Sequence, residues 1–202
     1  MPQTRIVQLL FYQAQPNDHF MNRLVSWFDP PYVHVEIRFE DGMASSVYAG
    51  ETVFFRNRTY ANPHYRIETF TVEDRDYQAM YRHCRLRAAH NVGFDGLGMY
   101  LAILPLISRN PPDRTFCSRY VTEVLQLGNV PEFVMLTPCR TTPSMLFKAV
   151  RSSNRTLFSS VPFKIELAVQ GACGPQDLHP GKKRRGTVTE EGIVPIAFTP
   201  RV

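Results

Sequence analysis

The feature that most constrains the fold is a strict alternation of apolar and polar side chains over residues 32–39, Tyr-Val-His-Val-Glu-Ile-Arg-Phe. A period of two is typical of a β-strand with one buried face, so His34 and Glu36 are expected on the opposite, half-exposed face. The turn sequence Glu40-Asp41-Gly42 follows, and it predicts a hairpin whose second strand covers 43–48. A lone histidine on such a face is usually a solvated surface residue, and that remains the alternative for His34.

A second constraint comes from residues 115–127, which begin Thr-Phe-Cys-Ser-Arg-Tyr. Apolar side chains recur there at helical spacing, and Gly128 ends the run. We expect Thr115 to be the N-cap, which places Cys117 in the first helical turn. Unpaired N–H groups and the helix dipole favour an anion there, and so favour the thiolate form of Cys117. The alternative is a small, buried and inert cysteine. The apolar positions of this helix are Tyr120, Val121, Val124 and Leu125.

The remaining segments predict a mixture of short strands and helices. Thr142 and Pro143 are typical of a helix start, because threonine caps well and proline suits the first helical position. Together these segments predict an α+β domain in which an antiparallel sheet packs against helices, including the one that carries Cys117. The predicted strands are 6–12, 52–55, 67–72 and 163–169, and the predicted helices are 17–28, 73–88, 94–104 and 143–150.

The composition is that of a globular chain, since 44% of the 202 residues are hydrophobic and 12% are aromatic. This length suits one domain, which we expect to span residues 1–170. Residues 171–202 are rich in Gly, Pro and charge, and we interpret them as a C-terminal extension. A solvated loop is expected at their basic run, and a weak contact with a polyanion is the alternative. The basic run consists of Lys182, Lys183, Arg184 and Arg185.

The four cysteines form no CxxC pair and no metal-ligand spacing, so we expect free thiols in a reducing compartment, without a metal or cofactor. Cys84 lies on the apolar stripe of the predicted helix 73–88 and is expected in the core. Cys139 lies in a loop and is a lesser candidate than Cys117 for a reactive thiol. No convincing signal peptide is visible, and the apolar run 97–107 is too short to span a bilayer. We therefore expect a soluble cytoplasmic protein, with a nuclear location as the alternative suggested by the basic run.

The order of these pieces resembles the circularly permuted branch of the NlpC-type papain-like hydrolases, which includes lecithin:retinol acyltransferase-like proteins and YiiX-like bacterial and poxviral relatives. In ordinary papain-like enzymes the cysteine helix comes first, whereas here His34, in a His-Val-Glu context, precedes the Phe-Cys-Ser of Cys117. Residues 91–95, Asn-Val-Gly-Phe-Asp, loosely resemble the family's Gly-x-x-Tyr-Asp segment, with Asn and Phe replacing Gly and Tyr. Residues 142–144 resemble its Thr-Pro-Ser. The resemblance covers roughly residues 5 to 170.

The resemblance implies a permuted papain-like fold and acyl transfer on an amide, ester or thioester. Cys117 would be the nucleophile, and its backbone N–H at the helix start would stabilise the oxyanion. His34 would keep the thiol ionised and then protonate the leaving group. Peptides, lipids and other acyl compounds are all substrates of such relatives, so the substrate stays open.

One position departs from the family pattern. The third polar residue, which orients the imidazole, should lie on the strand paired with that of His34, and hairpin counting places it at Ser45 or Ser46. A serine hydroxyl orients more weakly and supplies no charge, so Glu36, on the same strand as His34, is the fallback. This departure leaves a second hypothesis open, a catalytically inactive papain-like binding module. A third, a nucleic-acid-associated protein, depends on the net charge of +5 and on the basic run.

Overall fold

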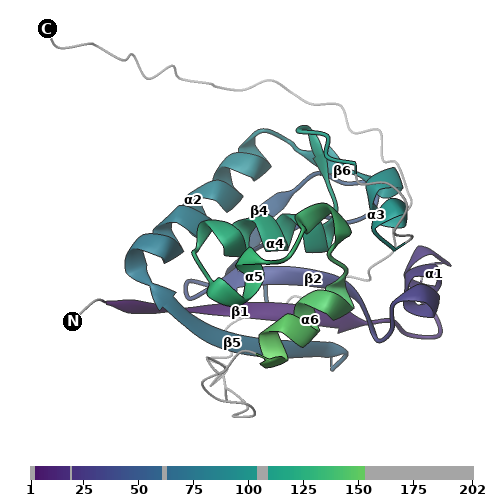
Figure 1. Cartoon of the computed structure of the whole chain (residues 1–202), viewed down its shortest axis with the longest axis horizontal. Helices are drawn as coiled ribbons and strands as arrows, with labels where there is room; N and C mark the ends of the chain where they lie inside the picture. Colours follow the sequence, from purple (N-terminus) through teal and green to yellow (C-terminus); the bar gives the residue numbers. More distant parts are fainter. Residues whose placement is uncertain (1–2, 19, 61–62, 104–108, 153–202) are drawn as a thin grey trace, which may run out of the picture. The chain divides into compact units, whose positions relative to one another are not determined.

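A computed structural model describes residues 3–18, 20–60, 63–103 and 109–152 of the chain (Figure 1). The described residues form an α+β structure in which a five-stranded antiparallel sheet packs against several helices. The predicted fold class, α+β with an antiparallel sheet, is therefore confirmed. The strands are β1 (Thr4–Gln13), β2 (Tyr32–Phe39), β3 (Met43–Ser46), β4 (Phe54–Asn57), β5 (Tyr65–Glu73), β6 (Gly93–Phe94) and β7 (Arg114–Thr115). The helices are α1 (Phe20–Phe28), α2 (Asp74–Ala89), α3 (Gly96–Ile103), α4 (Cys117–Leu127), α5 (Pro131–Val134) and α6 (Pro143–Ser152), with a 3-10 helix at Pro138–Arg140.

The sheet has the order β4-β3-β2-β1-β5, and every neighbouring pair is antiparallel. β1 and β2 pair along most of their length, with Val35 opposite Phe11. β3 pairs with β2 over a much shorter stretch, in which Ile37 is opposite Ser45 and Arg38 is opposite Ala44. The β3 side of the β2 backbone is therefore not covered by strand pairing around Val35.

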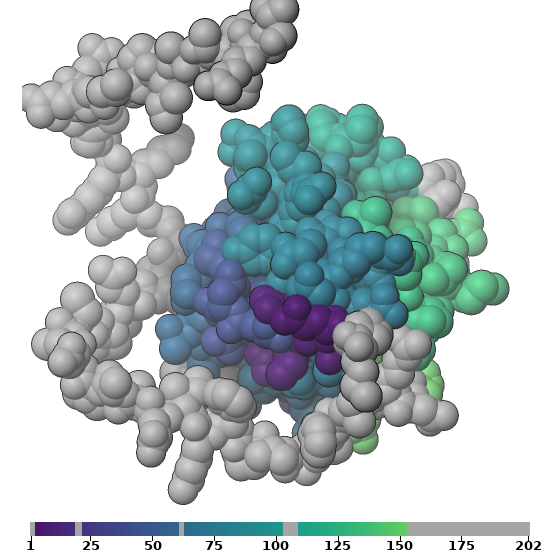
Figure 2. Space-filling model, turned by 90° about the vertical axis from the view of Figure 1, so that its left-hand side faces the viewer, coloured from purple at the N-terminus to yellow at the C-terminus, as the bar shows by residue number. Residues whose placement is uncertain are grey.

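Helices α2, α4 and α6 cover one face of the sheet. The odd-numbered side chains from 7 to 11 in β1 and from 35 to 39 in β2 lie in one hydrophobic core with apolar residues of all three helices. Figure 1 shows α4 and α6 crossing the sheet, and Figure 2 shows the outer side of α2 next to the start of β1. The predicted position of Cys84 is confirmed, since it is fully buried in this core. The predicted apolar positions of α4 are confirmed as well, because they are all buried: Tyr120, Val121, Val124 and Leu125.

The prediction that the other face of β2 is half-exposed was wrong. His34 is 7% exposed and Glu36 is 0% exposed. Tyrosine side chains from the segments after β3 and β4 and from the start of β5 contact Glu36 and cover this face. The alternation of apolar and polar residues identified the strand correctly, but it could not show that polar side chains elsewhere would enclose the polar face.

The predicted N-cap of the cysteine helix was also wrong. Thr115 belongs to β7, and its carbonyl accepts a 2.7 Å hydrogen bond from the Asp95 N–H. The N-cap residue is Phe116, which is extended and makes no side-chain capping bond. Cys117 is the first residue of α4, so its predicted place in the first turn is confirmed.

Other predicted boundaries are close to the observed ones. Thr142 caps α6 as expected, because its Oγ1 accepts a 3.2 Å hydrogen bond from the Met145 N–H. The predicted strand at 163–169, the domain boundary at 170 and the basic run at 182–185 lie outside the described residues. Within the described parts of the chain, no helix is both long and apolar enough to cross a membrane.

A buried hydrogen bond ties α4 to the sheet and provides a test of this packing. The Tyr120 hydroxyl lies 2.7 Å from Ser45 Oγ, which itself donates to the Phe54 carbonyl. We expect Tyr120→Phe to lower the free energy of unfolding by about 1 kcal/mol in urea denaturation, because a buried hydrogen bond is lost without a cavity. Tyr81→Phe is the matched control, since the Tyr81 hydroxyl bonds Asp41 at an exposed position and its loss should cost less. Equal stability of wild type and Tyr120→Phe would contradict this role.

Candidate active site around Cys117

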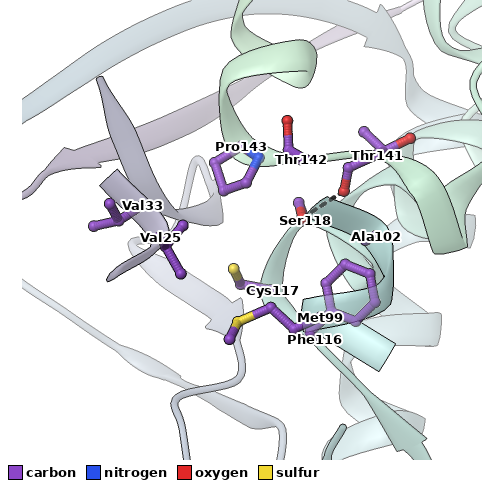
Figure 3. A pocket seen from close by; sticks show the side chains of 10 residues that line it. All are labelled: Val25, Val33, Met99, Ala102, Phe116, Cys117, Ser118, Thr141, Thr142 and Pro143. Carbon is purple, nitrogen blue, oxygen red and sulfur yellow. Dashed lines mark hydrogen bonds between the residues drawn. The ribbon is translucent and has the colours of Figure 1, made fainter. Parts of the chain in front are cut away.

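Cys117 lies at the bottom of a small hollow between helices and the sheet. The hollow is small, with room for about one water molecule (about 10 Å³), and Cys117 itself is 5% exposed. Figure 3 shows the Cys117 side chain pointing into this space, with Val25 and Val33 on one side and Met99 on another. No charged residue is among the described residues that line it: Val25, Val33, Met99, Ala102, Phe116, Cys117, Ser118, Thr141, Thr142 and Pro143.

The Cys117 thiol interacts directly with the His34 imidazole. Burial raises the pKa of Cys117, but the charge of His34 and a hydrogen bond with it outweigh this effect and leave the pKa below that of an ordinary thiol. Burial likewise opposes the charged form of His34. The Cys117 thiolate and then Glu36 overcome it and raise the pKa of His34 to about 9. Each of the two groups therefore favours the charged form of the other.

The short pairing between β2 and β3 explains how Cys117 reaches His34. Because β3 leaves β2 before Val35, the backbone of Val35 on that side is free for other partners. Its carbonyl accepts a 2.7 Å hydrogen bond from Ser46 Oγ. Backbone hydrogen bonds at Val35 and Ser118 lower the pKa of Cys117, so they come from N–H groups that stabilise the thiolate. The sulfur thus approaches β2 at its uncovered edge, where the neighbouring His34 can contact it.

Glu36 lies on the other side of the imidazole. Its Oε1 is 3.4 Å from His34 Nε2, which is within ion-pair distance. The Nε2–H is not aligned for a regular hydrogen bond, since Nε2 is buried without a partner of good geometry. We therefore describe this contact as an ion pair in which Glu36 stabilises the imidazolium. Cys117, His34 and Glu36 form a continuous line from the hollow into the sheet.

The Glu36 carboxylate is enclosed by donors. Arg58 Nη1 lies 3.0 Å from Oε1 and 3.2 Å from Oε2, and the Tyr48 hydroxyl donates to Oε1 at 2.5 Å. The Tyr60 hydroxyl donates to Oε2, and the Tyr65 hydroxyl lies 3.5 Å from Oε1. Burial raises the pKa of Glu36, but His34, Arg58 and Tyr48 outweigh it and lower the pKa to about 2. The carboxylate is therefore ionised at any pH at which the protein would work.

Ser45 and Ser46, the positions that hairpin counting predicts for the orienting residue, both use their hydroxyls elsewhere. Ser46 donates to the Val35 carbonyl, and Ser45 donates to the Phe54 carbonyl. The geometry instead brings the fallback residue, Glu36, to the imidazole. The counting failed because a residue two positions along the same strand shares the face of His34, and its longer side chain reaches Nε2.

The two segments that resemble family motifs hold the surroundings of Cys117. Asp95 is 2% exposed, and its Oδ1 accepts a 3.0 Å hydrogen bond from the Gly98 N–H at the start of α3. A side chain at Gly98 would place Cβ 2.2 Å from Asp95 Oδ2, so this close approach requires glycine. Ser144 bonds the Asp29 carbonyl through its Oγ at 3.0 Å, which joins α6 to the segment before β2. Both segments stabilise elements that line the hollow.

The other described cysteines lack such surroundings. Cys84 is fully buried in the core, and burial raises its pKa to about 12. Cys139 lies in the 3-10 helix and is half-buried. The described residues contain no group of three or more His, Cys, Asp or Glu side chains that could hold a metal ion.

Sequence reasoning missed the residues that enclose Glu36, namely Tyr48, Arg58, Tyr60 and Tyr65. They come from three separate segments, and nothing in their spacing predicts that they converge. The only sequence signal is the density of aromatic residues between 48 and 65, which by itself indicates packing rather than a carboxylate site.

Comparison with known proteins adds no further assignment. No protein-family model matches the chain, and no curated protein and no solved structure matches it either. What is established is an α+β structure that brings together a cysteine at a helix start, a histidine and a buried carboxylate.

Proposed function

We propose that this protein is a thiol hydrolase or acyltransferase of the permuted papain-like type, acting on an amide, ester or thioester through a covalent acyl-enzyme. The observation that carries the proposal is the buried line of Cys117, His34 and Glu36, with the thiol facing a hollow. Perturbed titratable groups that contact one another beside a pocket are typical of active sites. The chain order of histidine before cysteine supports the permuted type.

In the first half of the reaction the Cys117 thiolate attacks the carbonyl carbon. A carbon–sulfur bond forms, the bond to the leaving group breaks, and the His34 imidazolium gives its proton to the leaving amine, alcohol or thiol. In the second half neutral His34 takes a proton from water, or from another acceptor, which attacks the thioester. The acyl product leaves, and the thiolate–imidazolium pair is restored.

The start of α4 supplies the groups that would stabilise the oxyanion. Regular helical bonding begins with the Tyr120 N–H, which donates to the Phe116 carbonyl at 2.9 Å. The N–H groups of the first helical residues have no acceptor within the helix, and the one at Cys117 lies next to the nucleophilic sulfur. The positive end of the helix dipole at this position favours the developing negative charge.

The residues around the hollow bear on the kind of acyl group that would enter beside Cys117. Its walls are apolar apart from the hydroxyls of Ser118, Thr141 and Thr142, and Ser118 Oγ is already bonded to the Thr141 carbonyl at 2.7 Å. A charged acyl group would lose its hydration there without gaining a charged partner among the described residues, which costs several kcal/mol. We therefore propose that the acyl group is uncharged and largely apolar.

The inactive-module hypothesis depended on a weak third residue at the serine positions. Glu36 weakens that argument, because it places a full negative charge 3.4 Å from the imidazole. The nucleic-acid hypothesis depended on the net charge of +5 and on the basic run, which lies outside the described residues, so that hypothesis stays untested. Because Glu36 supplies the charged residue beside the imidazole, we favour the enzyme hypothesis.

The first prediction concerns the thiolate–imidazolium pair. Limiting iodoacetamide should modify Cys117 before any other cysteine, as read by mass spectrometry of the digested protein. His34→Ala removes the cation but leaves the helix start, so the pKa of Cys117 read from alkylation rate against pH should rise toward the roughly 8.5 of a free cysteine.

Ser46→Ala is the matched control, since its hydroxyl bonds the Val35 backbone rather than the imidazole. Its alkylation profile should resemble that of the wild type. Superimposable profiles for wild type and His34→Ala would sink the proposed function, because the nucleophile would then have no base.

The second prediction concerns the acyl group. The p-nitrophenyl esters of butyrate and succinate have acyl chains of equal length, and only the second carries a carboxylate. We expect the butyrate ester to acylate Cys117 at least ~10-fold faster, because the described residues that line the hollow include no charged side chain. The burst of p-nitrophenol measures the acylation rate, and Cys117→Ser provides the background. A succinate ester that reacts as fast as the butyrate ester would show that the acyl group does not enter this hollow.

A further inference from the structure

We propose that Tyr48 and Arg58 are positioning residues for the Cys117–His34 pair, which they control through the Glu36 carboxylate and the plane of the imidazole ring. Neither residue lines the hollow, so neither is placed to touch the acyl group. The inference rests on the proposed function and deepens it, since it names the residues that set the charge balance and the orientation of His34.

Tyr48 contacts both members of the ion pair at once. Its ring stacks on the His34 ring with centroids 4.5 Å apart and an interplanar angle of 17°. Its hydroxyl donates to Glu36 Oε1 at 2.5 Å. One side chain therefore limits rotation of the imidazole and holds the carboxylate oxygen that faces Nε2. On its other side Tyr48 stacks on Phe54, at 5.6 Å between centroids, so its own position is supported by β4.

Arg58 supplies the charge that makes a buried carboxylate tolerable. Its Nη1 contacts both oxygens of Glu36, which has no exposed surface. Burying an ionised carboxylate is costly unless it is paired and hydrogen-bonded, and an unpaired one takes up a proton instead. The guanidinium lies 5.1 Å from the Tyr60 ring centroid and 5.5 Å from that of Phe54, distances at which aromatic faces attract a cation. Arg58 is thus fixed by aromatic side chains and faces Glu36.

The groups around Glu36 show why this arrangement matters for the reaction. His34 faces it from β2, Tyr48 from the segment after β3, Arg58 and Tyr60 from the segment after β4, and Tyr65 from β5. Arg58 and His34 are the only cations among these groups. Arg58 balances part of the carboxylate charge, so without it the ionised Glu36 would hold the imidazolium more strongly.

The consequence is a shift in the pH profile. An acyl transfer that needs a protonated His34 should fall in rate as the pH rises through the pKa of His34, which is about 9. The pKa of Glu36 is about 2, so the carboxylate stays ionised at this pH even without Arg58. Its charge is then no longer shared with the guanidinium, which raises the pKa of His34, so the alkaline limb should move to higher pH. A residue that only stabilised the fold would change the amount of active protein and not the position of this limb.

The test compares kcat/KM against pH, with p-nitrophenyl butyrate, in wild type and in four variants. Arg58→Gln should move the alkaline limb up by about one pH unit, because it removes a cation next to the ionised Glu36–His34 pair, and such a charge shifts a neighbouring pKa by roughly one unit or more. Arg58→Lys keeps a charge but loses the planar contact with both oxygens, and its shift should be smaller. Tyr48→Phe keeps the stacked ring and loses only the hydroxyl, whereas Tyr48→Leu loses both and should reduce kcat about 10-fold or more by releasing the imidazole.

Alkylation of Cys117 in the same variants separates the two proposals. If His34→Ala leaves the alkylation profile unchanged, the proposed function itself is wrong. Circular dichroism first shows which Arg58 and Tyr48 variants are folded. If His34→Ala changes the alkylation profile but these folded variants keep the wild-type alkaline limb and the wild-type kcat, only the positioning role is wrong. Should Arg58→Gln fail to fold, Arg58→Lys and Tyr48→Phe decide the question, because unshifted limbs and unchanged kcat in both would overturn the assignment.

Discussion

The site depends on one interaction, the enclosure of the Glu36 carboxylate inside the sheet. A wholly buried negative charge persists only where cations and donors surround it, and Arg58, His34 and three tyrosines provide them. That requirement links the segments after β3 and β4 with the start of β5. It also gives His34 a fixed partner on one side, which leaves the thiolate of Cys117 as its partner on the other.

The backbone contributes as much as the side chains. Strand β3 ends its pairing with β2 before Val35, and the freed edge accepts the first residue of α4. Had the hairpin continued in register, the backbone of Val35 would be paired with β3 and Cys117 could not approach it. The early divergence of β3 therefore places the thiolate beside a backbone N–H, a helix start and an imidazole at once. Each of these favours the ionised thiol, and together they outweigh its burial.

Local patterns predict local features well here. The alternation in 32–39 identified β2 with its observed bounds, the apolar stripe identified the buried face of α4, and the Thr-Pro pair identified the start of α6. The choice of Glu36 over Ser46, and the presence of Tyr48 and Arg58, could not be predicted in the same way. They depend on contacts between residues 10 to 29 positions apart, whose convergence is decided by the packing of the whole sheet. The Thr115 cap failed for the same reason, because β7 pairs with the distant β6.

The most direct test of this account is the protonation state of His34, measured by NMR of the imidazole carbons and nitrogens. The signal is assigned among the six histidines by its loss in His34→Ala. The account predicts an imidazolium at pH 7 to 8 that titrates near pH 9. A ring that is neutral at pH 7 and titrates at or below the roughly 6.5 of a free histidine would contradict it, because no thiolate–imidazolium pair would then exist.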